Sequence, residues 1–336
     1  MSYRIGDRVR RAVPALALLT FGLAVALTIG ETGLRIAKFK YRTFPTVQFG
    51  WPEPEKLAEL FVPDRDLFWV PRGYHRTLAA AQERRPAVAF LGDSCTQFGT
   101  YPERTLDRLR AVSPSLAHGI NLGVGGWSSV QGLAQLQRDV LPLRPQVATF
   151  YFGWNDHWAA LGSPDDAARP GALTFWLSQN SRLFQLLLKA RLAIGLRLDS
   201  ARPNRVDLDA YRRNLRDMAC LSQRAGIRPV FITAGSNHRL GHEPEYLAER
   251  HLRKLEELVP LHNAYLAVTR EVAQQTDSTL CDAAHTFEQA GEDRDRFFKK
   301  DGIHLTDDGN QALADLVAGC ILAALAPRPL SAACTP

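Results

Sequence analysis

The chain has few cysteines, the residues that form the disulfide bonds of small exported domains and that often bind metals. It contains five cysteines among 336 residues, and they are dispersed, odd in number and free of CxxC spacing: Cys95, Cys220, Cys281, Cys320 and Cys334. This pattern predicts neither a zinc site nor a disulfide framework, so we expect buried thiols, with Cys95 as a small residue opening a helix. Low-complexity and collagen-like bias are also absent, which predicts one sizeable folded domain with appendages.

Three familiar motifs are missing as well. The GxSxG elbow of α/β-hydrolases is absent, because Thr96 stands where its second glycine would lie. The glycine run at 123–125 approaches a dinucleotide-binding fingerprint, but Ser128 occupies the third glycine position and no acidic residue follows at the required distance. His238 and His242 lie four residues apart without an HExxH motif. The sequence therefore predicts no metal and no cofactor.

The positive charge is concentrated at one end of the chain. The formal net charge is +6, and residues 1–42, with eight basic and two acidic side chains, account for all of it. A nucleic-acid-binding protein would carry its excess charge on the folded domain. Here the basic residues flank an apolar segment instead, so we expect no nucleic-acid partner and a location close to a membrane.

The apolar segment covers residues 12–30 and contains no charged residue. As a helix it would reach about 28 Å, roughly the hydrocarbon thickness of a bilayer. It can be an uncleaved anchor or a signal peptide cleaved after the small residues at 24–26. Because apolar residues continue to Ile29, we favour an anchor at 1–42, with the amino terminus in the cytoplasm. The predicted location is the inner membrane, single-pass, with the catalytic domain in the periplasm.

The remaining chain is organised as an α/β domain. A lead-in covers residues 43–85, a domain covers 86–326, and residues 327–336 form a tail. Short apolar runs alternate with longer amphipathic ones, which is typical of a parallel sheet. We expect strands at 86–92, 118–123, 146–153, 228–235 and 278–283, and helices near 101–112, 128–140, 207–225, 252–276 and 306–325. The predicted fold is a three-layer αβα sandwich with a five-stranded parallel sheet, of flavodoxin-like kind.

Four short sequence blocks follow the ends of these strands or precede the last helix. They are Gly92-Asp93-Ser94, the glycine turn at 121–128, Gly153-Trp154-Asn155-Asp156, and Asp301-Gly302-Ile303-His304. Ligands of open parallel sheets bind at the carboxyl ends of the strands. Singly, each block could be structural: Ser94 a helix cap, or Asn155 and Asp156 turn formers. Their joint placement at one edge of the sheet favours a catalytic site.

Together the blocks resemble those of the SGNH/GDSL hydrolase family, and the resemblance covers residues 86 to about 325. It implies Ser94 as the nucleophile, Gly126 and Asn155 in an oxyanion hole, and Asp301 and His304 as the other members of a catalytic triad. The chain differs from simpler members by an insertion at about 157–206.

The chemistry of these residues agrees with the resemblance. A serine hydroxyl needs an imidazole to remove its proton, and His304 is available for this. Asp301, three residues earlier, can orient the imidazole and stabilise its charged form. The backbone N–H groups of Ser94 and Gly126 and the amide of Asn155 can stabilise the oxyanion.

The substrate is less well defined by the sequence. We expect an ester hydrolase that removes acyl groups, including O-acetyl, from an envelope carbohydrate or lipid. The alternative is a relative that transfers an acyl group or only binds a glycan. Four residues close to the strand ends are predicted substrate contacts: Trp127, Trp154, His157 and His238.

The insertion has a basic amphipathic composition. From Ala167 to Leu198 it carries five basic residues and no acidic one, among many leucines and aromatic residues. Such a helix can lie in a membrane interface, or it can pack on the domain as a lid. Both interpretations predict a helical segment within the insertion, which begins shortly after Asn155.

Overall fold

The structure is a computed structural model that describes residues 3–41, 59–160, 163–198, 203–247, 252–326 and 331–335. The chain divides into two compact units. One contains residues 1–43 and 170–199, and the other contains residues 44–169 and 200–336. The N-terminal helix therefore shares a unit with the middle of the insertion, whereas the sheet belongs to the other unit.

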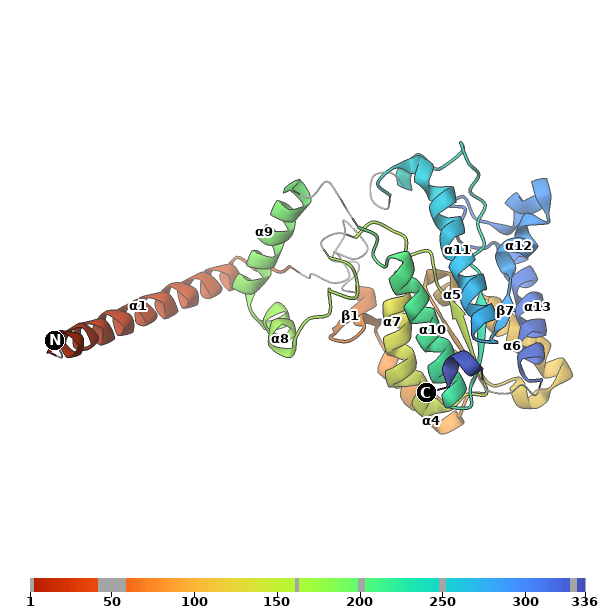
Figure 1. Ribbon diagram of the computed structural model, residues 1–336, viewed down its shortest axis with the longest axis horizontal. Helices are drawn as coiled ribbons and strands as arrows, with labels where there is room; N and C mark the ends of the chain where they lie inside the picture. The colour runs from red at the N-terminus through yellow and green to blue at the C-terminus, as the bar shows by residue number, and fades with distance from the viewer. Residues whose placement is uncertain are drawn as a thin grey trace. The chain divides into compact units, whose positions relative to one another are not determined.

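The smaller unit consists of three helices, α1 Tyr3–Ile36, α8 Ala172–Asn180 and α9 Arg182–Leu198 (Figure 1). Within α1, the segment Leu16–Ile36 has a mean hydropathy of 1.6, and none of it is buried in the structure. By length and composition, this one N-terminal helix can span a membrane or serve as a signal sequence.

The larger unit is built on a five-stranded sheet in the order β4-β3-β5-β6-β7, in which every neighbouring pair is parallel. The strands are β3 Val88–Gly92, β4 Gly119–Asn121, β5 Val147–Tyr151, β6 Arg228–Ile232 and β7 Thr279–Cys281. This is the flavodoxin-like order, with its switch point between β3 and β5. The predicted five-stranded parallel sheet is confirmed, and all five strands lie within the expected segments.

Both faces of the sheet are covered, because side chains alternate along each strand. In β3, Val88 and Phe90 belong to one apolar cluster, while Ala89 and Leu91 belong to the other. The first cluster includes side chains of α6 Tyr101–Val112, α12 Ala283–Glu288 and α13 Asp307–Ala324. The second includes side chains of α7 Ser129–Gln135, α10 Leu208–Arg224 and α11 Leu258–Gln275. The result is the expected three-layer sandwich.

Two of the expected helices differ in detail. The first, α7, continues as a π-helical segment, Leu136–Val140, so the predicted helix at 128–140 is irregular at its end. The second, α11, begins at Leu258 and not at residue 252. Pro260 lies in the first turn of α11, where its missing N–H costs no helical hydrogen bond. Shorter 3₁₀ turns lie at Pro114–Leu116, Leu141–Leu143, Glu245–Leu247, Leu255–Glu257, Gly291–Phe297 and Ala332–Cys334.

The lead-in contains regular structure that the sequence did not indicate. Residues 43–58 lie outside the described residues, but β1 Phe61–Asp64 and β2 Phe68–Pro71 form an antiparallel hairpin, followed by α4 Tyr74–Arg84. The buried Trp69 donates from its indole nitrogen to the carbonyl of Gly125 at 3.3 Å. Trp127 donates in turn to the carbonyl of Trp69 at 3.1 Å. The hairpin thus packs against the glycine turn after β4.

The expectation of free core thiols is wrong for four of the five cysteines. Cys220 is bonded to Cys334, and Cys281 is bonded to Cys320. Cys95 alone is free and buried. The pairs were not visible in the sequence because their separations of 114 and 39 residues reflect tertiary packing, not a spaced motif. One disulfide ties the C-terminal segment to α10, and the other joins β7 to α13.

Candidate active site

Ser94, His304 and Asp301 form a continuous hydrogen-bonded chain. The His304 Nε2 atom lies 2.9 Å from Ser94 Oγ, and its Nδ1 atom lies 2.8 Å from Asp301 Oδ2. The His304 and Asp301 side chains remain 30% and 34% exposed. The nucleophile, base and orienting carboxylate of a serine hydrolase would be arranged in this way, with one side open to a substrate.

Ser94 owes its position to the end of β3. The strand stops at Gly92, Asp93 caps the short helix α5 Ser94–Gln97, and the Asp93 Oδ1 atom accepts the N–H of Cys95 at 2.9 Å. The N–H of Ser94 has no acceptor among the described residues. It belongs to the first turn of a helix, where backbone N–H groups are available to an anion.

Asp301 is held ionised by its own turn. Its Oδ1 atom accepts the backbone N–H groups of Ile303 and His304, each at 2.9 Å. Although partial burial opposes it, the hydrogen bonds from the His304 side chain and from these two backbone groups lower the pKa of Asp301 to about 2. An ionised Asp301 accepts from Nδ1, which leaves Nε2 of His304 facing Ser94 as the basic nitrogen.

The two expected oxyanion donors lie in neighbouring turns. Gly126 has a φ of 78°, a left-handed conformation that glycine adopts without strain, and its N–H has no acceptor within the described stretches of the chain. Asn155 donates one amide hydrogen to Asp93 Oδ2 at 3.0 Å. Since a carboxamide has two such hydrogens, the second remains for a ligand.

Asp93 therefore connects the nucleophile turn with Asn155. Burial raises the pKa of Asp93, against the opposing effects of its hydrogen bonds and of His304. Asp156, which directly follows Asn155, has a similar role, because its two oxygens accept the N–H groups of Ser129 at 2.8 Å and Gly153 at 3.1 Å. Both carboxylates fix the turns that carry the site.

Comparison with known protein families assigns the chain to one of them. The model of the GDSL-like Lipase/Acylhydrolase family matches residues 90–312. The chain belongs to this family. It is accordingly a hydrolase that acts on ester bonds of an acylated substrate.

The solved structures to which the chain is similar include GDSL-like lipases and acetyl xylan esterases. A putative GDSL-like lipase from Parabacteroides merdae is 16% identical, with 70% of this chain and 94% of that chain covered and a TM-score of 0.48. A GDSL-like lipase from Bacteroides thetaiotaomicron is 19% identical over 76% and 97%, with a TM-score of 0.47. An acetylxylan esterase from Geobacillus stearothermophilus is 18% identical over 72% and 94%, with a TM-score of 0.43. No curated protein matches the chain in sequence.

The four expected substrate contacts of this GDSL hydrolase are all buried in the structure. Trp127 is 0% exposed and hydrogen-bonded to the hairpin, so a direct contact with substrate does not fit its placement. Trp154 is 2% exposed and stacks on His262 at 4.0 Å between ring centroids. The His157 Nε2 atom lies 3.1 Å from His262 Nδ1. These aromatic side chains pack beneath the turn that carries Asn155.

His238 contacts the backbone of the turn that carries Asp301. Its Nε2 atom lies 2.9 Å from the carbonyl oxygen of Asp301, and the adjacent Asn237 N–H donates to the carbonyl of Gly302 at 2.9 Å. Gly302 has a φ of 69°, and a Cβ there would lie 2.6 Å from His238 Nε2. Burial lowers the pKa of His238, despite the opposing effect of Asp301. The neutral ring therefore donates to the carbonyl of Asp301.

A buried ion pair beside Gly126 was not predicted from the sequence. Arg205 and Asp165 are 1% and 0% exposed and pair through Arg205 Nη2 and Asp165 Oδ2 at 2.7 Å. Arg205 also donates from Nη1 to the carbonyl oxygen of Gly126 at 2.7 Å. Both residues lie inside the insertion, where no family block or periodicity marks them.

Burial also determines whether the thiol beside Ser94 can react. Burial raises the pKa of Cys95 well above its usual range, so the thiol next to Ser94 stays protonated.

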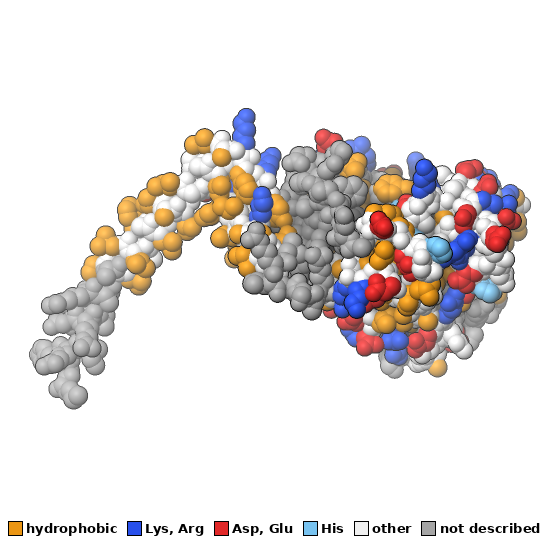
Figure 2. All heavy atoms as spheres, turned by 90° about the horizontal axis from the view of Figure 1, so that it is seen from above, with side chains coloured by type: hydrophobic (Ala, Val, Ile, Leu, Met, Phe, Trp, Pro, Cys, Tyr) orange, Lys and Arg blue, Asp and Glu red, His pale blue; other side chains and the backbone are white. Residues whose placement is uncertain are grey.

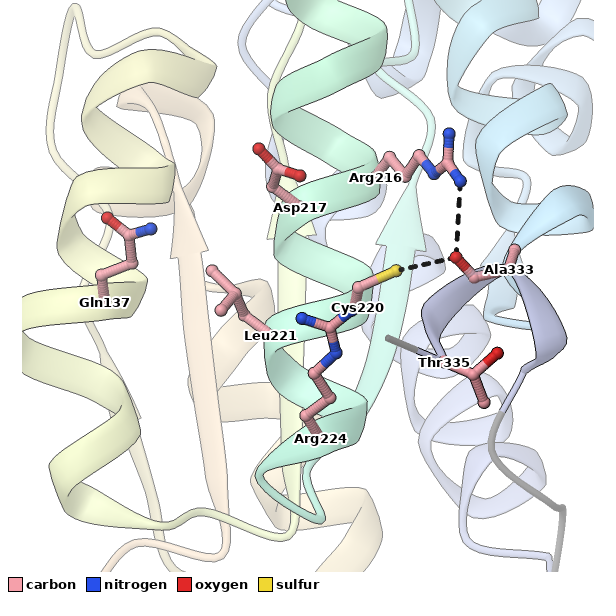
Figure 3. Close-up of a pocket in the computed structure, with 8 residues that line it drawn as sticks. All are labelled: Gln137, Arg216, Asp217, Cys220, Leu221, Arg224, Ala333 and Thr335. Carbon is pink, nitrogen blue, oxygen red and sulfur yellow. Dashed lines mark hydrogen bonds between the residues drawn. The ribbon is translucent and has the colours of Figure 1, made fainter.

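A surface pocket of about 470 Å³ is lined by the C-terminal half of α10, by Gln137 and by the C-terminal segment (Figure 3). Arg216 and Arg224 donate there to the carbonyls of Ala333 and Cys334. None of the expected site residues lines this pocket.

Proposed function

We propose that this GDSL hydrolase is a serine esterase anchored in the inner membrane, which removes acyl groups from an envelope carbohydrate or lipid through an acyl-enzyme at Ser94. The observation that carries the proposal is the hydrogen-bonded chain from Asp301 through both nitrogens of His304 to Ser94 Oγ. Such a chain activates a hydroxyl group that is otherwise a weak nucleophile.

In the first half of the reaction, Ser94 Oγ attacks the carbonyl carbon of the ester while His304 Nε2 takes the hydroxyl proton. The carbonyl π electrons move to oxygen, and this oxyanion accepts hydrogen bonds from the N–H groups of Ser94 and Gly126 and from the Asn155 amide. The intermediate then collapses. The bond to the alcohol oxygen breaks, His304 gives its proton to that oxygen, and the acyl group remains on Ser94.

In the second half, a water molecule takes the place of the alcohol. His304 removes a proton from the water, and the resulting hydroxide adds to the acyl carbon. Collapse of this intermediate breaks the bond to Ser94 Oγ, which regains the proton from His304, and the carboxylic acid leaves. Asp301 stabilises the positive charge on His304 in both halves without exchanging a proton itself.

Two observations support an extracytoplasmic location. The helix α1 has an exposed apolar segment long enough to hold the chain in a membrane. The pairs Cys220–Cys334 and Cys281–Cys320 form in oxidising compartments such as the periplasm and are rare in the cytosol. Acylated carbohydrates and lipids of the cell envelope would be within reach of an enzyme anchored there.

The exposure of His304 and Asp301 leaves room for a large alcohol. His304 and Asp301 are each about one-third exposed, so the leaving alcohol, which takes its proton from His304, can extend into solvent. A glycan or lipid headgroup fits such an opening, and O-acetyl is the simplest acyl group that the proposal predicts.

The test is a fluorophosphonate probe on the full chain, combined with hydrolysis of p-nitrophenyl acetate, butyrate and octanoate and of acetylated xylan. We expect the probe to label Ser94 and the Ser94→Ala variant to lose both labelling and hydrolysis. Cys95→Ala is the matched control and should keep both, because its thiol is buried. Labelling that persists in Ser94→Ala would refute the assignment of the nucleophile.

A further inference from the structure

The first turn of α9 is capped by a carboxylate from α1. Glu31 accepts the backbone N–H groups of Arg182 at 3.0 Å and Leu183 at 2.9 Å, and the hydroxyl of Ser181 at 3.0 Å. Backbone N–H groups in the first turn of a helix have no partner within that helix, and a negative charge is favourable there. The insertion is thus fastened to the N-terminal helix by the residue that directly follows the charge-free segment 12–30.

Further contacts hold the same two elements together. Arg35 donates to the carbonyl of Asn180 at 2.6 Å, and Gln185 accepts the backbone N–H of Tyr41 at 3.1 Å. The Lys189 ammonium lies 5.9 Å from the ring centroids of Phe39 and Tyr41. The helix pair α8–α9 therefore lies beside the C-terminal end of α1, where the candidate span Leu16–Ile36 ends.

Beyond these contacts, the helix pair exposes large apolar side chains. Leu173 and Trp176 of α8 are 69% and 58% exposed, and Leu187 and Ile194 of α9 are 59% and 57% exposed. Positions 183, 187, 190 and 194 are apolar and follow one another at helical spacings of three and four, so they share a stripe. Figure 2 shows hydrophobic side chains along α1 and over the helices beside its C-terminal end.

Basic residues border this stripe. Lys189 and Arg191 are exposed and Arg182 is half-buried, while the sequence from Ala167 to Leu198 contains no acidic residue. An apolar stripe with cations on its flanks is the pattern of a helix that lies in the plane of a membrane interface. Cations next to a membrane are attracted by anionic headgroups.

We propose that α8 and α9 form a membrane-docking surface. In this arrangement Leu173, Trp176, Leu187 and Ile194 insert at the boundary between headgroups and acyl chains, and Arg182, Lys189 and Arg191 contact anionic phospholipid. Continuity with α1 selects the bilayer as the occupant, because Glu31, five residues before the end of the candidate span, fixes the start of α9. The inference rests on the proposed anchoring of the chain by α1, and it assigns a lipid-binding role to the insertion.

Trp176 provides a direct probe of this surface. The chain has six tryptophans. Four are buried, at positions 69, 127, 154 and 158, and Trp51 lies outside the described residues. The difference in emission between the wild-type chain and Trp176→Phe therefore reports Trp176. The full chain is reconstituted in vesicles of phosphatidylcholine and phosphatidylglycerol in equal parts, prepared with either ordinary or brominated acyl chains.

We expect the Trp176 emission to fall below about half in the brominated vesicles, because a ring that lies about 5–10 Å deep is within reach of the bromine atoms. The triple variant Arg182→Gln, Lys189→Gln, Arg191→Gln should lose most of this quenching. A matched variant, Arg108→Gln with Arg110→Gln on α6, should keep it. Trp176 emission that is equal in both kinds of vesicle overturns the inference, as does full quenching in the triple variant.

Two parallel measurements separate this result from the proposed function. Carbonate extraction shows whether α1 holds the chain in the bilayer, and ester hydrolysis shows whether Ser94 acts. A chain that resists extraction and hydrolyses esters, but whose Trp176 is not quenched, refutes the docking surface alone. A chain released by carbonate refutes both the anchor and the docking surface, whereas loss of hydrolysis with quenching intact refutes only the catalytic assignment.

Discussion

Arg205 donates a hydrogen bond to the carbonyl oxygen of Gly126 across 79 positions of sequence. Asp165 holds the guanidinium in place and also accepts the hydroxyl of Ser128 at 2.7 Å. Two segments of the insertion, one before α8 and one after α9, thus meet at the glycine turn. The conformation of Gly126, a proposed oxyanion donor, therefore depends on residues outside the four family blocks.

Replacing Arg205 by methionine should separate the positioning of Gly126 from stability. Loss of the guanidinium frees the Gly126 carbonyl, and we expect kcat to fall roughly 10- to 100-fold with little change in KM, less than the loss of a donor itself. The buried Asp165 is left without its partner, which costs about 3–5 kcal/mol of stability. Steady-state kinetics and urea denaturation measure the two effects.

The double variant Arg205→Met, Asp165→Leu is the decisive comparison. Removing both charges should restore much of the stability, because an apolar pair can replace a buried ion pair at small cost. The kcat should nevertheless remain low, since Gly126 still lacks its donor. A double variant with wild-type kcat would show that Arg205 only stabilises the fold.

Asn155→Ala should lower kcat roughly 100- to 1,000-fold, the usual loss for one oxyanion donor, with folding intact. The alanine removes the amide that bonds to Asp93 and faces the site from the turn after β5. Asn204→Ala is the control, because that amide donates to Tyr265 and not to Asp93. A loss of less than about threefold in Asn155→Ala would demote the residue to a turn former.

The low pKa of Asp301 predicts how its contribution to stability varies with pH. Its pKa in the folded state, about 2, lies below the ordinary 3.8, so the ionised carboxylate stabilises the fold. This contribution is fully present above about pH 4 and is lost as the pH falls through about 2. The difference in free energy of unfolding between wild type and Asp301→Asn should follow this course. A pH-independent difference for Asp301 would contradict the prediction.

The disulfides should stabilise the larger unit, which contains the sheet, by about 2–4 kcal/mol each, because each closes a long loop in the unfolded chain. Cys281→Ala with Cys320→Ala, and Cys220→Ala with Cys334→Ala, should each lower the denaturation midpoint. The same double variants should also respond less to a reducing agent than wild type does. Thiol titration of the exported, unfolded chain should find one free thiol, and five would exclude both bonds.

The strands and the proximity of Ser94, Asp301 and His304 could be predicted from the sequence because they depend on local patterns. Alternating apolar runs identify buried parallel strands, and a parallel sheet gathers the residues that follow those strands at one edge. Ser94, Asn155 and the turn from Asp301 to His304 each follow a strand or precede a helix. Their proximity in the structure follows from that rule.

Contacts between distant segments could not be predicted in the same way. The pairing of Cys281 with Cys320 and the bond from Arg205 to Gly126 depend on how helices and the insertion pack after the sheet has formed. The buried indole of Trp127 shows the opposite error. The position of Trp127 near the site suggested a substrate contact, but its side chain packs against the hairpin and donates to the carbonyl of Trp69. The hairpin itself showed no clear periodicity in the sequence.

The last prediction concerns His238, whose ring contacts the turn that carries Asp301. Its Nε2 atom donates to the carbonyl of Asp301, and Trp154 packs edge-on against the ring at 5.5 Å between centroids. Since burial lowers the pKa of His238, the ring is neutral, and Nε2 must carry its hydrogen to make this bond. We infer that His238 holds the turn in which Asp301 orients His304.

Two substitutions distinguish this role from simple packing. His238→Gln places an amide donor close to the position of Nε2 and should keep most of the activity. His238→Phe keeps an aromatic ring beside Trp154 but removes the donor, so the turn can shift and kcat should fall about tenfold. KM and the denaturation midpoint should change little, because the Asp301 carbonyl still accepts the hydroxyl of Tyr246 at 3.2 Å and is not left unpaired. If glutamine and phenylalanine have equal effects on kcat, the hydrogen bond to Asp301 does not matter for catalysis and His238 serves only to fill space.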